Sequence, residues 1–348
     1  MMESVLFCAG VALFFTVLFA WGFRALPREE WQFLAVVPKK RLSSRIWDGR
    51  NLTFYGFFNA LAQLVSLLFF LLLASSVGIP VRMSLATILL LMSVTMPASR
   101  LLARLIEKKP HTATVSGGFF AGTVFAPAAV WLGSHLTGAV QADSWAPLYA
   151  SMAIAYAFGE GTGRLACLSF GCCYGRPLSD DPRSLDRFIR PLGLVFTGKT
   201  KKIAYASGWE GRPVWPVQAA TSVIYAATGL LGVCLFLSGR YRFALAVVIA
   251  VTQLWRIVSE FFRGDYRGER RISVYQIFSV LSVLLIFPAG TLLAPSGASA
   301  DLTAGFTAIW SLPLILFLQG WTLFVFWHSG RSSVTGGTLS FHVRKENI

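Results

Sequence analysis

Residues 53–78 read TFYGFFNALAQLVSLLFFLLLASSVG, a run without a single charged side chain. A helix of about 20 mostly apolar residues crosses the roughly 30 Å hydrocarbon core of a bilayer, so this stretch predicts a transmembrane helix. Similar runs recur along the chain, near residues 4–23, 83–106, 112–138, 145–172, 214–238, 241–262, 272–294 and 303–328. The sequence therefore predicts about nine transmembrane helices.

The composition points to the same class of protein. Apolar residues make up 55% of the 348 residues and charged residues only 14%, and the mean hydropathy is +0.61. These values exclude a soluble globular domain. We expect an all-α, polytopic membrane protein.

Positive charge alternates along the chain. Twenty-six of the 31 Lys and Arg residues lie in every second gap between predicted spans, whereas the other gaps hold only Arg82, Arg240 and Arg242. The positive-inside rule places the basic gaps in the cytoplasm and the N-terminus outside. For most of these charges, orientation of the chain and contact with anionic headgroups are a sufficient explanation. The basic gaps are residues 24–52, 100–111, 176–213, 263–271 and the C-terminal tail.

Two of the basic gaps are long enough to be more than connectors. Residues 24–52 contain the apolar stretch 31–37 between basic residues, which predicts a short amphipathic segment in the headgroup layer. Residues 176–213 are polar and predict a small cap over a site. Neither gap is large enough for a domain with its own core.

The stretch 160–177 reads EGTGRLACLSFGCCYGRP. Small residues at the end of a span allow backbones to approach closely or interrupt the helix beside a cavity. Arg164 lies well inside this span, and a cation at that depth needs a polar cavity or a counter-charge. The stretch therefore predicts the wall of a site.

A second charged constellation, WRIVSEFFRGD, occupies residues 255–265. Arg256 and Glu260 are four residues apart and Glu260 and Arg263 three, so all three can share one helical face. One interpretation is a self-neutralised network. The other is an anion clamp in which Glu260 orients two guanidinium groups that grip a phosphate. Two Arg-bearing segments on one side of the membrane favour a phosphate-binding cavity.

Three of the five cysteines cluster at residues 167, 172 and 173. Their spacing is no standard zinc pattern, adjacent cysteines rarely form a disulfide, and the histidines offer no paired spacing nearby. Close packing, a thiol with a chemical role and metal binding all stay open, with packing favoured. We predict no metal and no cofactor.

The order of several short motifs resembles the bacterial prolipoprotein diacylglyceryl transferase family. The resemblance covers about residues 53–294 and implies a seven-helix body, with one additional helix at each end of the chain. The additional segments are residues 1–52, with the basic amphipathic loop, and residues 295–348, with the last helix and the tail. The motifs are Tyr55-Gly56, Arg100, Ser116-Gly117-Gly118, Gly163-Arg164 to Gly175-Arg176, Pro216-Val217-Gln218, Arg256 to Arg263 and Ser273-Val274-Tyr275-Gln276-Ile277.

The resemblance implies a lipid transferase in the bacterial inner membrane. The family moves the diacylglyceryl group of phosphatidylglycerol to the thiol of a lipobox cysteine and releases glycerol phosphate. Such a displacement needs cations around the departing phosphate and a group that takes the thiol proton. Its partners would be a phospholipid donor and an acceptor protein or small molecule, with no nucleic acid.

The resemblance also assigns roles by motif position. Arg164 and Arg256 match the family's essential arginines. The catalytic residues that we predict are Arg164, Arg256, Glu260, Glu160, Cys172 and Cys173, the last three as alternative bases. The predicted substrate-binding residues are Arg100, Gly117, Gly118, Gly163, Gly175, Arg176, Gln218, Arg263 and Gln276.

The sequence also departs from the family pattern. Ser116 and Trp215 stand where the family has histidines, and Cys172 and Thr221 stand where it has glutamates. The family's catalytic face is turned away from the cytoplasm, whereas charge asymmetry turns the same face of this chain inward. Two alternatives follow: a transferase with a different, possibly cytoplasmic acceptor, and a lipid-binding protein without catalysis.

Overall fold

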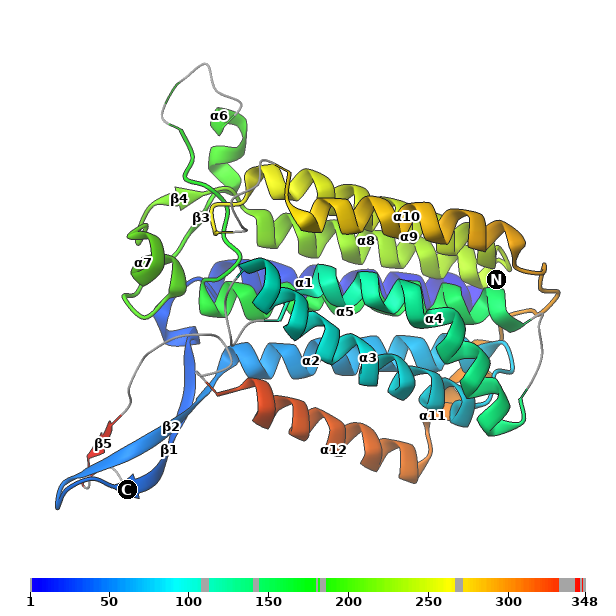
Figure 1. Ribbon diagram of the computed structural model, residues 1–348, viewed down its shortest axis with the longest axis horizontal. Coiled ribbons are helices and arrows are strands. Elements are labelled where there is room, and N and C mark those ends of the chain that lie inside the picture. The colour runs from blue at the N-terminus through cyan, green and yellow to red at the C-terminus, as the bar shows by residue number, and fades with distance from the viewer. Residues whose placement is uncertain are drawn as a thin grey trace.

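In this computed structural model, long helices lie side by side in one bundle, with the N-terminus at one end and a small cap and a hairpin at the other (Figure 1). The structure describes residues 2–107, 113–139, 144–179, 181, 186–266, 272–331, 342–344 and 346. We call the end that carries the cap and the hairpin the cap end.

The bundle consists of α1 (Met2–Ala25), α2 (Phe54–Ser76), α3 (Val81–Glu107), α4 (Val115–Thr137), α5 (Trp145–Phe170), α8 (Val217–Leu237), α9 (Tyr241–Ser259), α10 (Val274–Leu292) and α12 (Leu312–Ser329). The shorter helices are η1 (Glu29–Trp31), α6 (Asp186–Ile189), η3 (Arg190–Leu192), α7 (Lys202–Ser207), η4 (Glu260–Phe262) and α11 (Leu302–Ile309). The strands are β1 (Phe33–Arg41), β2 (Ile46–Thr53), β3 (Leu194–Val195), β4 (Pro213–Val214) and β5 (His342–Arg344).

The prediction of a polytopic all-α membrane protein is confirmed. Within the described residues, eight helices are long and apolar enough to cross a bilayer: α1, α2, α3, α4, α8, α9 with η4, α10 and α12. Helix α5 has 26 residues but carries Glu160 and Arg164. It lies inside the bundle, so lipid does not have to solvate these charges.

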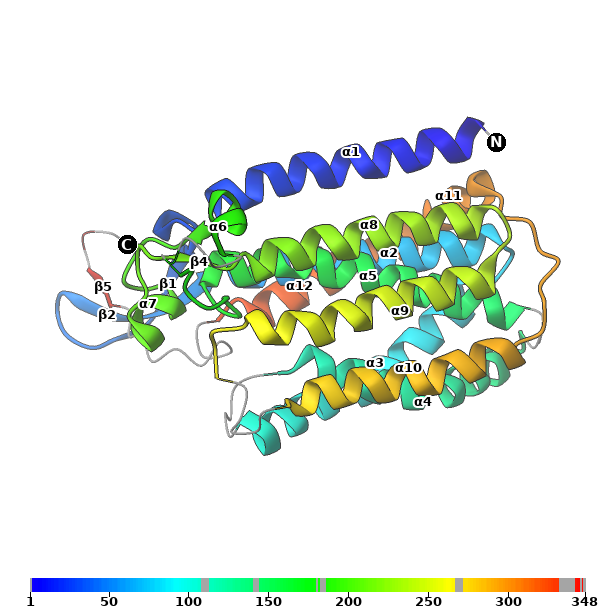
Figure 2. The same ribbon diagram turned by 90° about the horizontal axis from the view of Figure 1, so that it is seen from above.

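Helix α5 is the centre of the bundle. It packs on α2, α8 and α9, while α1 lies along one side and α3, α4 and α10 along the other (Figure 2). Small residues allow this packing: a Cβ on Gly159 would lie 2.9 Å from Ser66 Cβ on α2, and one on Gly161 would lie 3.2 Å from Ser222 O on α8. The close approach encloses the charged face of α5.

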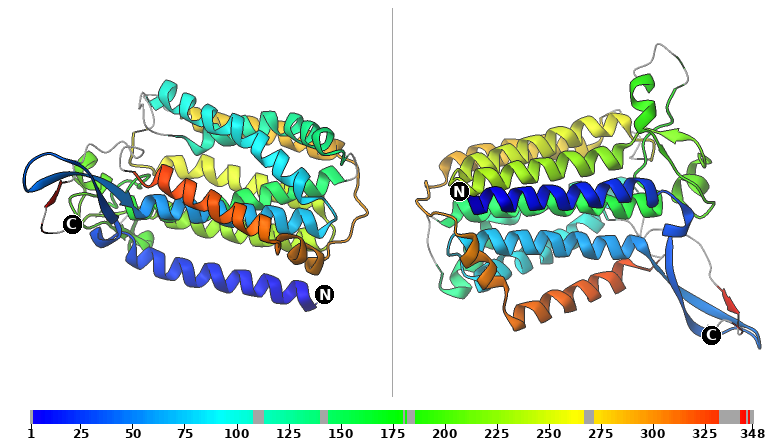
Figure 3. Two further views of the ribbon diagram at one scale, coloured as in Figure 1. Left: turned by 90° about the horizontal axis from the view of Figure 1, so that it is seen from below. Right: turned by 180° about the vertical axis from the view of Figure 1, so that it is seen from behind.

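The basic gaps lie at the cap end. The described parts of the connections at residues 26–53, 171–179, 186–216 and 260–266 are at this end, and those at 77–80, 238–240 and 293–301 are at the opposite end (Figures 1 and 3). The alternation of basic and neutral gaps therefore follows the two ends of the bundle.

Residues 33–53 differ from the amphipathic loop that we expected. They form an antiparallel hairpin of β1 and β2, and β5 pairs with β2 as a third strand. The β-branched and aromatic residues on both sides of the turn at Ser43 and Ser44 favour extended structure. The hairpin extends away from the bundle at the cap end (Figure 1).

The last predicted span, 303–328, is two helices. Helix α11 ends at Ile309 and α12 begins at Leu312, with Ser311 as its N-cap and Pro313 in its first turn. Proline has no N–H to continue a helix but is favoured in a first turn. The apolar run gives no sign of this break, because a single proline changes the mean hydropathy of the segment only slightly.

Lys201 fastens the cap to the bundle. Its side chain is fully buried, and Nζ donates hydrogen bonds to the carbonyls of Leu26 and Ser169, at 3.0 and 2.5 Å. These carbonyls lie at the C-terminal ends of α1 and α5, where unpaired carbonyls attract a cation. Burial lowers the pKa of Lys201 to about 7. The cap is therefore held against the end of α5.

Candidate active site

Two arginines from different helices meet at one carboxylate. Arg164 Nη2 on α5 and Arg256 Nη1 on α9 both donate to Glu160 Oε1, the second at 3.2 Å. The side chains of Arg164, Arg256 and Glu160 are only 9%, 7% and 8% exposed. Glu160 lies one turn before Arg164 on α5, so both point toward α9. We call these three residues the Arg–Glu–Arg cluster.

The Arg–Glu–Arg cluster has an unbalanced charge. Two guanidinium groups share one carboxylate, which leaves one positive charge in a buried place. Arg164 Nε is buried and has no hydrogen-bond partner among the described residues, and Glu160 Oε2 accepts no hydrogen bond from them. Burial of an uncompensated charge and an unpaired donor is costly. The arrangement suits a bound anion, which would supply both the missing charge and the missing acceptor.

Ser116 completes the contacts of Arg256. Its Oγ on α4 accepts a hydrogen bond of 2.5 Å from Arg256 Nε. The sequence motifs include Ser116, which is also a departure from the family pattern, but they do not indicate this contact, because the two residues are 140 positions apart. It brings α4 into the site beside α5 and α9.

An apolar cavity of about 460 Å³ lies next to the cluster. Its walls come from α2, α3, α4, α5 and α9, with side chains such as Leu67, Met92 and Met152. Thr114 and Tyr156 also line it, and Tyr156 interacts electrostatically with Arg256 and Glu160. Tyr156 therefore lies between the apolar cavity and the cationic cluster, whose three residues do not themselves line the cavity.

Glu260 does not pair with the arginines as we predicted. In the described residues Arg256 pairs with Glu160, and Arg263 donates from Nε and Nη2 to the two oxygens of Asp265, at 2.6 and 2.8 Å. Helix α9 ends at Ser259, and the 3-10 helix η4 begins at Glu260. Glu260 interacts electrostatically with Arg263 but forms no ion pair with it among the described residues.

Arg176 belongs to the cap. Its guanidinium makes a two-point ion pair with Asp186, at 2.8 and 2.9 Å, and lies over the Trp215 ring. Asp186 also accepts hydrogen bonds from Ser179 N and Trp215 Nε1. The Arg176 hydrogen bonds, together with these two, lower the pKa of Asp186 to about 2. Trp215 thus orders the cap.

An Asp186→Asn substitution is expected to loosen the cap. It removes the charge that pairs with Arg176, whose side chain is 42% exposed, so the cost is smaller than that of breaking a fully buried pair. Because the folded-state pKa lies below the unfolded value, the parent cap keeps this stabilisation above about pH 4 and loses it as the pH falls toward 2. Limited proteolysis at neutral pH should therefore cleave residues 176–213 faster in the variant. The control is Glu30→Gln, which alters an exposed ion pair and should be cleaved at the rate of the parent. If Asp186→Asn were also cleaved at the parent rate, Asp186 would not hold the cap in place.

The remaining polar residues that we predicted to bind substrate lie elsewhere or make structural contacts. Arg100 is exposed on α3 and its Nη2 lies 2.7 Å from His328 Nε2 on α12. Gln276 forms a capping box with Ser273 and donates to Ile257 O. Gln218 Nε2 donates to Cys172 O at 3.0 Å and so supports the cysteine segment.

The predicted glycines permit close packing. Gly117 and Gly118 face Leu102 and Ser99 of α3, Gly163 lies near Ala62 of α2, and a Cβ on Gly175 would lie 2.3 Å from Trp215 O. Gly175 also forms a bridge with Arg263. These glycines position the elements of the site through backbone contacts.

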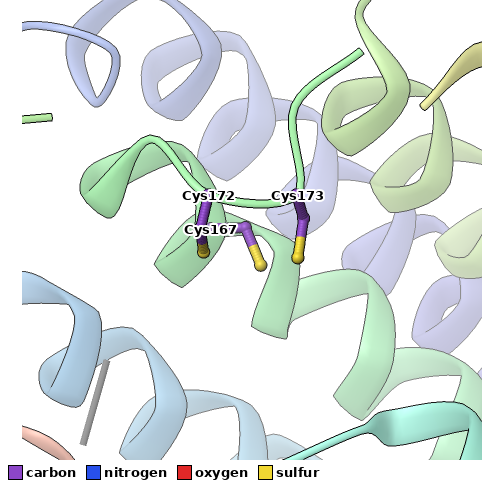
Figure 4. Close-up of side chains that lie close together, drawn as sticks. All are labelled: Cys167, Cys172 and Cys173. Carbon is purple, nitrogen blue, oxygen red and sulfur yellow. The ribbon is translucent and has the colours of Figure 1, made fainter. Parts of the chain in front are cut away.

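The three clustered cysteines come together at the C-terminal end of α5. Cys167 is in the last turn of the helix, and Cys172 and Cys173 follow on the segment that folds back over it (Figure 4). The three sulfur atoms lie within 4.8 Å of one another, and all three residues are partly exposed. Arg164, one turn before Cys167, interacts electrostatically with Cys167 and Cys173. The thiols therefore lie beside the Arg–Glu–Arg cluster.

Comparison with known proteins identifies one related family. The family model described as prolipoprotein diacylglyceryl transferase matches residues 45–291, which is more than half of the chain. The match includes the Arg–Glu–Arg cluster, the cysteines and the cap, and it ends before α11 and α12. No curated protein matches the sequence significantly.

Proposed function

Because the chain belongs to the prolipoprotein diacylglyceryl transferase family, we propose that it moves the diacylglyceryl group of phosphatidylglycerol to the thiol of a lipobox cysteine and releases glycerol phosphate. The chain is a multi-pass membrane protein of a transferase family. The donor, the acceptor and a place in a bacterial inner membrane are parts of the proposal.

The single observation that carries the proposal is the excess positive charge of the Arg–Glu–Arg cluster beside the apolar cavity. The guanidinium groups of Arg164 and Arg256 would hold the phosphate and stabilise the negative charge that grows as it departs. The acyl chains would occupy the cavity along α3 and α4. Glu160 would fix both guanidinium groups.

The direct test supplies purified protein with phosphatidylglycerol labelled in the headgroup and with a lipobox-cysteine peptide. We expect water-soluble glycerol phosphate to be released together with a diacylglyceryl thioether on the peptide. A peptide with serine in place of the cysteine is the matched control and should release little. Lipid binding without release in both arms would reject the enzyme in favour of the non-catalytic lipid-binding protein.

The basic cap end supports one alternative, a transferase whose acceptor lies in the cytoplasm. An impermeant thiol reagent applied to intact cells distinguishes the two orientations. Phe188, which is 77% exposed on α6, is changed to cysteine and compared with Arg240→Cys at the opposite end of the bundle, with the parent chain as background. The proposed function requires labelling at position 188. Labelling at position 240 alone would move the acceptor to the cytoplasm.

A Gly122→Phe substitution is expected to discriminate between long-chain and short-chain donors. Gly122 lines the apolar cavity from α4, so a phenyl ring would take space from an acyl chain. We expect KM for a long-chain donor to rise about tenfold, which corresponds to about 1.4 kcal/mol, with little change for a six-carbon donor. The matched control is Gly320→Phe on α12, where nothing lies within 4 Å of an added Cβ. Equal effects on both donors would indicate general damage.

A further inference from the structure

The cysteine cluster is a preformed triangle of sulfur atoms. All three Sγ atoms lie within 4.8 Å of one another, and they come from two segments that meet at the end of α5 (Figure 4). Zinc binds thiolates at about 2.3 Å, so three sulfurs on a tetrahedral Zn²⁺ lie about 3.8 Å apart. The observed triangle needs to contract by at most about 1 Å to hold such an ion.

The backbone is specifically arranged for this triangle. The chain leaves α5 through Gly171 at φ 69°, and Cys173 has φ 57°, the one positive φ of a described non-glycine residue. A left-handed conformation at such a residue costs free energy and persists only when its surroundings impose it. Here Cys172 N donates to Cys167 O at 3.1 Å, and Gly264 N donates to Tyr174 O at 3.0 Å. Both neighbours of Cys173 are therefore fixed.

Two guanidinium groups lie near the cysteine cluster. Arg164 and Arg263 both interact electrostatically with Cys173. Three thiolates and one Zn²⁺ carry a net charge of −1; Arg164 and Arg263 are already paired with Glu160 and Asp265, so they give this charge a polar surrounding and not a free counter-charge. Cys8 and Cys234 have no such surroundings, since they face each other from α1 and α8 with 3.2 Å between the sulfurs.

We propose that Cys167, Cys172 and Cys173 bind one Zn²⁺ and that its fourth coordination position receives the thiol of the acceptor. Three protein ligands and one open position are the pattern of catalytic zinc, whereas structural sites fill all four positions. The partial exposure of the three cysteines leaves access to the open position. This inference rests on the proposed function.

The chemistry balances without an oxidant or a reductant. The acceptor thiol loses its proton to solvent when its sulfur binds Zn²⁺, because a coordinating thiol is deprotonated. The sulfur then forms a bond to the glyceryl carbon while the bond between that carbon and the phosphate oxygen breaks. Glycerol phosphate leaves with the electron pair beside Arg164 and Arg256. Zinc would thus promote the deprotonation that a base would otherwise carry out. The resemblance to the family places Ser116 and Trp215 where the family has histidines.

The first experiment measures metal binding alone. The full-length protein, purified in detergent and treated with a chelator, is titrated with Zn²⁺ and separately with Co²⁺. We expect one tightly bound ion per chain and thiolate-to-cobalt absorption, with affinity at least tenfold lower in Cys173→Ser. The double variant Cys8→Ser, Cys234→Ser removes two thiols elsewhere and should bind like the parent. Equal Zn²⁺ affinity in Cys173→Ser and in the parent would overturn the proposed zinc site. The folding control is thermal unfolding without metal: an unchanged unfolding temperature of Cys173→Ser would show that the variant loses binding and not its fold.

The second experiment tests the open position. A lipobox-cysteine peptide added to the cobalt-loaded protein, with no lipid donor, should change the cobalt spectrum, and the serine peptide should not. An unchanged spectrum would overturn the acceptor role. The inference fails separately from the proposed function: release of glycerol phosphate that depends on Arg164 but persists in metal-free protein would refute the role of zinc in the transfer and support the transferase.

Discussion

Replacement of Arg164 or Arg256 by lysine is expected to reduce diacylglyceryl transfer by about 100- to 1,000-fold, the usual cost of removing one group that stabilises charge in a transition state. Lysine keeps the positive charge but not the planar set of donors, which can contact Glu160 and a phosphate at the same time. Arg256 uses Nε for Ser116 and Nη1 for Glu160 and has Nη2 left for a ligand. The ammonium group of lysine also has three N–H donors, but all three start from one nitrogen, so they cannot reach partners that are spaced around a planar guanidinium group.

The measurement is the initial rate of glycerol phosphate release at saturating donor, together with the amount of folded protein in the membrane. Arg242→Lys is the matched control, because Arg242 is on the same helix as Arg256 but near the opposite end, where Nη1 donates to Leu293 O. It should keep the parent rate. If both site variants stayed within about threefold of the parent, the arginines would be structural and the proposed phosphate site would be wrong.

The features of the fold that could be predicted are those that depend on the composition of a short stretch of sequence. A transmembrane helix is decided locally, by about 20 successive residues, and the alternation of basic gaps then gives the ends of the bundle. The break between α11 and α12 and the hairpin at residues 33–53 depend on capping and on strand pairing. Hydropathy does not report these features, so both were missed.

The predictable part of the site is the identity of the two arginines. A cation deep in a span is rare enough to stand out in a sequence, and the family motifs pointed to the same positions. The partner of Arg256 was not predictable. The i, i+4 rule favoured Glu260, but the helix tightens at η4, and the carboxylate comes from Glu160, 96 positions earlier in the chain. Contacts between distant helices leave no local signal.

The cysteines show the same limit. Their spacing does not match a zinc motif, because such motifs describe ligands on regular turns and fingers. In this chain the triangle depends on two left-handed residues, Gly171 and Cys173, immediately after a helix. A sequence pattern records only residue spacing and not the direction of the turn, so packing was the favoured interpretation.

A Glu160→Gln chain is expected to lose both stability and activity. The substitution keeps the shape of the side chain but removes the charge that two buried guanidinium groups share, and an uncompensated buried charge costs about 3–5 kcal/mol. The expected results are a lower unfolding temperature and a rate of transfer at least 100-fold below that of the parent, because neither arginine would be held in place. Glu3→Gln, at an exposed position on α1, should match the parent in both measurements.

The double variant Glu160→Gln, Arg164→Met separates the two effects of Glu160. It leaves Arg256 as the one cation of the cluster, so repulsion between the guanidinium groups is gone and part of the lost stability should return. Transfer should stay abolished, because the phosphate would have lost one of its two arginines. Residues in contact are expected to show such non-additive energies. Strictly additive losses of stability would mean that Glu160 and Arg164 act independently, and the carboxylate would then not be what holds the Arg164 guanidinium group in place for the phosphate.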